Sequence, residues 1–158
     1  MKYLFDTCSI IIVVKRRLGE DLNKYFRNVF VSEFVRKEFE NVPDDWTYFT
    51  GCFNVTVLDI ADMNMLAEMN GLMKASSGIS QTDASLVVLA KRNKYTLLIT
   101  EERLLRSISS HSGFKAKRLV ELLFDLKIEY AIIKSLYYDE IKKISSLPRE
   151  DEKILFNR

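Results

Sequence analysis

Four acidic residues stand out as side chains whose types and positions could do chemistry: Asp6, Glu38, Asp83 and Glu102. Asp6 directly follows a short apolar run that is typical of a buried parallel strand, so we expect it at the carboxyl end of that strand. In open α/β sheets, this edge is where ligands bind. A carboxylate beside an apolar core needs hydrogen-bond donors or a cation.

The other three acids are predicted to reach the same edge from different elements. Glu38 falls on the apolar stripe of a helix expected over residues 33–41, Asp83 lies on the inward face of a strongly apolar helix, and Glu102 follows a buried strand at 95–99. Oxygen ligands without matching His or Cys favour Mg²⁺ or Mn²⁺ over Zn²⁺. Such ions generate hydroxide from water and stabilise the charge on a phosphodiester, so the pattern indicates phosphoryl chemistry.

Each acid also has an ordinary structural explanation. Asp6 could cap the helix that follows it, and Ser80 with Asp83 has the spacing of a capping box. Glu38 could pack its stem on apolar surface with its carboxylate in solvent, and Glu102 could be a first-turn acid. If all of these hold, the acids never meet and the chain is a doubly wound domain of unrelated function.

The order of the elements predicts the fold class. Short buried strands alternate with helices, which is the pattern of an α/β three-layer sandwich with a mainly parallel central sheet. The chain is long enough for one substantial core, so we expect a single domain over residues 1–158. A turn is expected at 43–46. The predicted strands are 3–5, 29–31, 53–58, 95–99 and 130–133. The predicted helices are 10–17, 20–27, 33–41, 60–74, 79–91 and 137–145, with further helices after Thr100 that run through 115–126 around a break at 112–113.

Composition limits the partners and the compartment. The 24 basic and 22 acidic residues leave a net charge of +2, so a polyanion would have to be bound by local patches. Cys8 and Cys52 form no metal-binding or disulfide pattern, and no apolar run approaches the ~20 residues of a membrane span. We therefore expect a cytoplasmic protein that does not insert into membranes.

Taken together, the motifs resemble the PIN-domain family, the fold of the VapC-type toxin ribonucleases. The resemblance extends from the first strand to about Arg106, and the part from about 107 is less typical. The motifs that carry it are Phe5-Asp6-Thr7-Cys8, Glu38 six residues after Ser32, Thr82-Asp83-Ala84, and Leu98-Ile99-Thr100-Glu101-Glu102.

The resemblance implies a metal-dependent endoribonuclease that cleaves single-stranded RNA and leaves a 5′ phosphate. It implies that Asp6, Glu38 and Asp83 bind Mg²⁺ or Mn²⁺. Glu102 maps to the family's fourth acid, which is usually Asp or Asn, and Glu101 could take that place. The residues expected to orient carboxylates or phosphate are Thr7, Ser9, Thr100 and Glu101.

The resemblance also implies partners. RNA is the expected substrate, an antitoxin protein could bind the chain if it is a toxin, and a homodimer could form through the Met-rich helix at 60–74. An alternative is a PIN-like module that binds RNA or protein and cleaves nothing, which Cys8 and the longer Glu102 both permit. The basic residues expected to contact the RNA backbone are Arg16, Arg17, Arg103, Arg106, Lys115 and Lys117.

Overall fold

A computed structural model describes residues 1–134 of the chain. Residues 1–119 form one compact unit, and a second unit begins at Val120. The elements in chain order are β1 (Lys2–Phe5), α1 (Thr7–Lys15), α2 (Gly19–Leu22), β2 (Asn28–Ser32), α3 (Glu33–Glu38), α4 (Pro43–Cys52), β3 (Asn54–Leu58), α5 (Met63–Ala75), α6 (Gln81–Arg92), β4 (Thr96–Ile99), α7 (Arg103–Ser112), β5 (Lys115–Lys117) and α8 (Leu119–Asp125).

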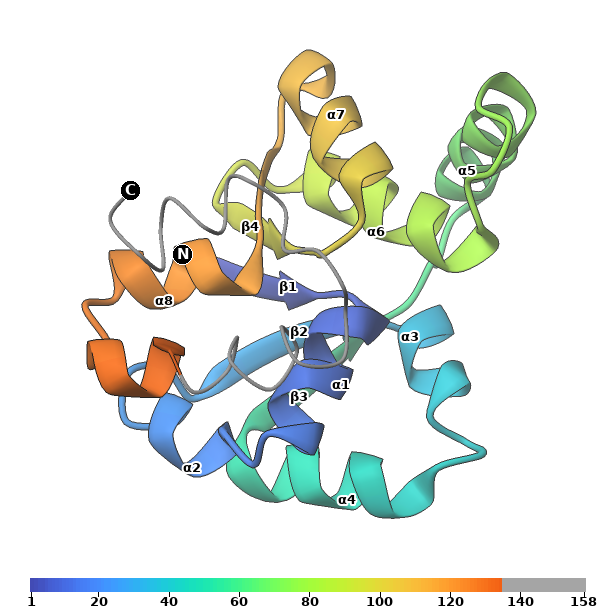
Figure 1. Cartoon of the computed structure of the whole chain (residues 1–158). Helices are drawn as coiled ribbons and strands as arrows, with labels where there is room; N and C mark the ends of the chain where they lie inside the picture. The colour runs from blue at the N-terminus through green and yellow to red at the C-terminus, as the bar shows by residue number, and fades with distance from the viewer. Residues whose placement is uncertain (135–158) are drawn as a thin grey trace. The chain divides into compact units, whose positions relative to one another are not determined.

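The strands form one parallel sheet in the order β3-β2-β1-β4-β5. Helices α1, α2 and α4 lie along one face, and α5, α6 and α7 lie on the other (Figure 1). The predicted α/β three-layer sandwich with a parallel sheet is therefore confirmed. None of the helices between residues 1 and 134 is long and apolar enough to cross a membrane.

The sheet topology brings distant segments to one edge. The chain runs from β1 outward to β2 and β3, then returns to the other side of β1 to form β4 and β5. The switch point therefore lies between β1 and β4, where Phe5 is in register with Ile99. Because all the strands are parallel, the residues that follow β1, β2 and β4 emerge at the same edge.

The burial of each strand explains how well the sequence predicted it. All four residues of β4 are buried, as are Leu4 and Phe5 of β1, since helices cover both faces of the sheet centre. Strand β3 lies at an edge of the sheet and none of its residues is buried. The helix predicted over 115–126 was wrong at its start, because residues 115–117 form β5 and α8 begins at Leu119. Strand β5 contains two lysines and no apolar run, a composition that suits an edge strand.

Three other expectations about the elements were wrong. Residues 43–46 were expected to form a turn, but Pro43 is the first residue of α4, where its missing N–H costs nothing. The helix predicted at 10–17 begins earlier, at Thr7. The strand predicted at 130–133 is helical, with the amides of Ile132 and Ile133 both bonded to the Glu129 carbonyl. The helix predicted at 137–145 lies outside the described residues.

Gly19 is the first residue of α2. A Cβ built at this position would lie 2.5 Å from Cys52 Sγ and 2.7 Å from Cys52 Cβ. The Gly19 amide also donates to the Tyr48 hydroxyl, at 3.1 Å. Helices α2 and α4 therefore approach so closely here that only glycine fits at position 19 without a clash.

We predict that Gly19→Ala lowers the free energy of unfolding by about 1–3 kcal/mol, because overpacking forces the backbone or Cys52 to move. Urea unfolding monitored by circular dichroism measures this. The matched control is Gly51→Ala in α4, where a Cβ would meet nothing within 4 Å. That variant should be neutral or slightly more stable, since Ala favours the helix. Equal destabilisation by the two changes would contradict the steric explanation.

Candidate active site

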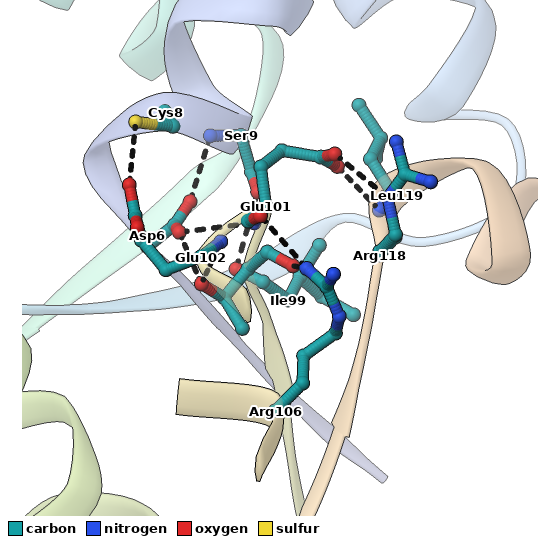
Figure 2. A network of polar contacts seen from close by, with 10 residues as sticks. Asp6, Cys8, Ser9, Ile99, Glu101, Glu102, Arg106, Arg118 and Leu119 are labelled. Carbon is teal, nitrogen blue, oxygen red and sulfur yellow. Dashed lines mark hydrogen bonds and ion pairs between the residues drawn. The ribbon is translucent and has the colours of Figure 1, made fainter. Parts of the chain in front are cut away.

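Asp6 is buried at the carboxyl end of β1, with only 3% of its surface exposed. Its Oδ1 accepts from the Ser9 amide at 2.7 Å, so Asp6 is the N-cap of α1. Its Oδ2 accepts from the Thr100 hydroxyl and from the Glu101 amide at 3.2 Å (Figure 2). The carboxylate thus caps a helix and also joins β1 to the segment that follows β4.

Thr100 and Ser9 complete this junction. The Thr100 hydroxyl accepts from the Glu102 amide at 3.0 Å, so it shapes its own turn and does not cap α7. The Ser9 hydroxyl donates to the Ile99 carbonyl at 3.2 Å. Ser9 and Thr100 are both completely buried. The two residues therefore fix the ends of β1 and β4 relative to each other.

Glu38 is exposed, contrary to its expected place on a buried helix stripe, because α3 ends at Glu38 itself. Its carboxylate reaches two hydroxyls from other elements. Oε2 accepts from Thr7, the residue after Asp6, and Oε1 accepts from Thr82 at 2.7 Å. Glu38 therefore lies between the first turns of α1 and α6.

Asp83 and Glu102 lie in this same region. Ser80 caps α6 by accepting from the Asp83 amide at 3.0 Å, as its spacing predicted. Burial raises the pKa of Asp83, the carboxylates of Glu102 and Glu38 raise it further, and hydrogen bonds from Ser80 lower it. Asp83 is thus both part of a helix cap and one of a group of acids that repel one another.

Cys8 stands at the border of this group. Its thiol contacts Glu102 Oε1 at 3.9 Å (Figure 2). Burial and the surrounding carboxylates, first Asp6 and then Glu102 and Asp83, raise the pKa of Cys8 to about 11. The sulfur is therefore a protonated, weak donor at neutral pH.

Glu101, the alternative to Glu102 as the fourth acid, forms its contacts outside this group of acids. Its carboxylate forms an ion pair with Arg118, with 3.0 Å between Nε and Oε2, and accepts from the Leu119 amide at 3.0 Å (Figure 2). Both side chains of the pair are largely buried. Glu101 therefore anchors the end of β5, and only its main-chain amide reaches Asp6.

The donor set suits a divalent cation. It consists of carboxylate oxygens, burial raises the pKa of Asp6 from 3.8 to about 6, and the nearby charge of Glu101 adds to that increase. Within residues 1–134, no three His, Cys, Asp or Glu side chains are placed closely enough to ligate one ion. Each oxygen of Glu38 accepts from one threonine hydroxyl, which leaves a second lone-pair direction on each for an ion.

The basic residues expected to contact RNA are placed unevenly. Arg106 donates to the carbonyls of Thr100 and Glu101, at 3.4 and 2.7 Å, so it supports the site's backbone. Arg16 and Arg17 follow α1 at the end opposite Asp6, and the Arg17 guanidinium stacks over Tyr48 at 4.5 Å. Of the remaining three, Arg103 is exposed and is the first residue of α7. Lys115 and Lys117 are the first and last residues of β5.

Sequence reasoning did not predict the contacts of two side chains that the fold brings to the site. Thr82 contacts Glu38 from a different helix, and Arg118 pairs with Glu101 from 17 residues away. The only local signal for Thr82 was its place beside Asp83. Nothing in the spacing of Arg118 indicated a buried ion pair.

Comparison of the sequence with family models gives the class to which this parallel sheet belongs. A family model described as a PIN domain matches residues 2–145. The chain belongs to the PIN-domain family. PIN domains are generally nucleases, so the fold points to a nucleic acid substrate. A search of curated proteins finds no match to this chain.

We predict that the metal-free protein is destabilised by Asp6 as the pH rises from about 4 to 6. The folded state holds the Asp6 proton to about pH 6 and the unfolded state releases it near 3.8, so the folded state binds more protons in this interval and stability falls. A shift of about two pKa units corresponds to about 3 kcal/mol. Urea unfolding in EDTA at pH 4 and pH 7 measures this.

The comparison with Asp6→Asn isolates this effect from other titrating groups. The wild type should lose about 2–3 kcal/mol more than the variant between the two pH values. Glu40→Gln, an exposed acid two residues after Glu38, should show the wild-type pH dependence. If the difference in free energy of unfolding between the wild type and Asp6→Asn does not change with pH, the raised pKa of Asp6 is contradicted.

We predict that Arg106→Gln lowers the free energy of unfolding by about 1–3 kcal/mol, because two carbonyls of the site lose a charged donor. If Arg106 instead contacted RNA phosphate, the slope of log Kd against log salt would fall by about 1. We expect that slope to stay unchanged. Arg103→Gln, an exposed change in the same helix, should alter stability by less than about 0.5 kcal/mol.

Proposed function

We propose that the protein is a metal-dependent endoribonuclease that cleaves phosphodiester bonds of single-stranded RNA and leaves a 5′ phosphate. The observation that carries the proposal is the mutual influence of acids from separate elements. Glu38 is the last residue of α3, Asp83 lies in the first turn of α6, and Glu102 follows β4. The charges of Glu38 and Glu102 both raise the pKa of Asp83. Family membership supports the reaction class.

On this proposal, Asp6, Glu38, Asp83 and Glu102 hold Mg²⁺ or Mn²⁺. When bound, the ion activates water and stabilises negative charge on the phosphodiester. Glu102 is favoured over Glu101 as the fourth acid, because Glu101 is already paired with Arg118.

The other residues around the site orient these carboxylates through hydrogen bonds. Asp6 Oδ2 accepts two hydrogen bonds and Oδ1 accepts one from the described residues, which leaves a lone-pair direction on Oδ1 for a cation. Thr100 and the Glu101 amide hold the Asp6 carboxylate in one orientation. Thr7 and Thr82 do the same for Glu38. This pre-organisation of ligands is what a metal site requires of its surroundings.

The resemblance to toxin ribonucleases leads us to extend the proposal to partners. We propose an antitoxin protein, a homodimer and a cytoplasmic location. The exposed side chains of Met63 and Leu66 on α5 support this helix as a dimer contact, since they are 85% and 45% exposed. Concentration-dependent sedimentation would test the dimer.

A second candidate function is a PIN module that binds RNA without cleaving it. It is favoured by the wide spacing of the carboxylates in residues 1–134 and by Cys8, a weak donor beside Glu102. Both candidates share the fold, so only catalysis separates them.

We predict that the purified protein cleaves a fluorescent single-stranded RNA in Mn²⁺ and that EDTA abolishes the cleavage. Asp6→Asn and Asp83→Asn should each lower the rate by about 100-fold or more, because each removes charge that would hold the ion. Gel analysis of the products, with and without phosphatase, shows the end groups.

The matched control is Glu40→Gln, which should cleave at the wild-type rate. Equal cleavage by wild type and Asp6→Asn would identify a contaminating nuclease. RNA binding by a wild type that does not cleave in Mn²⁺ or Mg²⁺ would favour the binding module.

A further inference from the structure

The Glu38 carboxylate is held by hydroxyls and by no described cation. Thr7 Oγ1 donates to one oxygen and Thr82 Oγ1 donates to the other, the latter at 2.7 Å. Thr7 immediately follows Asp6, and Thr82 immediately precedes Asp83. Each neighbouring aspartate of the site thus has an adjacent threonine that contacts the same glutamate.

The Thr82 hydroxyl is not needed to begin α6. Ser80 is the N-cap, and its Oγ accepts from the Asp83 amide at 3.0 Å. Ser85 Oγ donates to the Thr82 carbonyl, and the Thr82 hydroxyl donates to Glu38. Its contact with a side chain 44 residues away is therefore tertiary.

The two helices that carry Thr82 and Glu38 are fixed at their base. The hydroxyls of Ser32, the N-cap of α3, and Ser85 of α6 are hydrogen-bonded to each other at 2.9 Å, and both serines are completely buried. The Val35 amide donates to the same Ser32 hydroxyl at 3.2 Å. This buried contact joins α3 to α6, the same two helices that Glu38 and Thr82 join.

We propose that Thr82 is a positioning residue that, together with Thr7, holds the Glu38 carboxylate between the first turns of α1 and α6, where it can bind the divalent cation. This inference rests on the proposed function. A carboxylate oxygen has two lone-pair directions, so Glu38 can keep its hydrogen bonds to the threonines and still ligate an ion. Without Thr82, the exposed glutamate loses one of two restraints and pays more conformational entropy on binding.

The test is the affinity of the protein for Mn²⁺ in the absence of RNA, measured by the electron paramagnetic resonance signal of free Mn²⁺. Thr82→Val keeps the side-chain shape and removes the hydroxyl, and it should weaken Mn²⁺ binding by about 10-fold or more. Thr82→Ser restores the donor and should bind within about 3-fold of the wild type. Thr47→Val, an exposed threonine of α4, should bind as the wild type does.

A double-variant cycle shows whether Thr82 acts through Glu38. In a Glu38→Gln background, Thr82→Val should cause no further loss of affinity. An equal loss in both backgrounds, or no loss in either, would overturn the inference while the ribonuclease proposal stands. A wild type with no measurable Mn²⁺ binding would instead overturn both.

Discussion

The structure depends on a carboxylate that is buried where two parallel strands end. Asp6 has 3% of its surface exposed and accepts hydrogen bonds from the first turn of α1 and from the segment after β4. Burying a charge is tolerable only when donors surround it. Those donors come from elements more than 90 residues apart, so the sheet order must be correct before the charge can be stabilised. The site and the fold are therefore one set of interactions.

Around Asp6, the protein compensates some negative charges and leaves others. Arg118 pairs with Glu101 in a largely buried contact, and the Arg106 guanidinium covers the carbonyls of the same turn. By contrast, Asp83, Glu102 and Glu38 have no basic partner among the described residues. Burial raises the pKa of Asp83, and the charges of Glu102 and Glu38 raise it further. This division explains why Glu101 and Glu102, neighbours in sequence, have different roles. One secures β5, and the other adds to the charge that favours a cation.

Local interpretations of the acids were correct without being complete. Asp6 does cap α1, and Ser80 with Asp83 does form a cap of α6. Capping uses one oxygen or one amide, and the remaining atoms of the same residues take part in the site. For Glu38 the local argument failed, because α3 ends at that residue and its carboxylate turns to hydroxyls of two other helices. A helical stripe predicts burial only while the helix continues.

The sequence by itself determined the alternation of elements, the edge where Asp6 lies and the membership of the chain in the PIN-domain family, because apolar runs and strand-end acids are local patterns. It did not reveal β5, whose lysines hide the strand, or α4, whose proline resembles a turn signal. Only the tertiary structure decided that Arg106 and Arg118 serve the turn after β4, and that Thr82 reaches Glu38. Such contacts join residues far apart in the chain. Their energies depend on distance and burial, which no spacing along a sequence specifies.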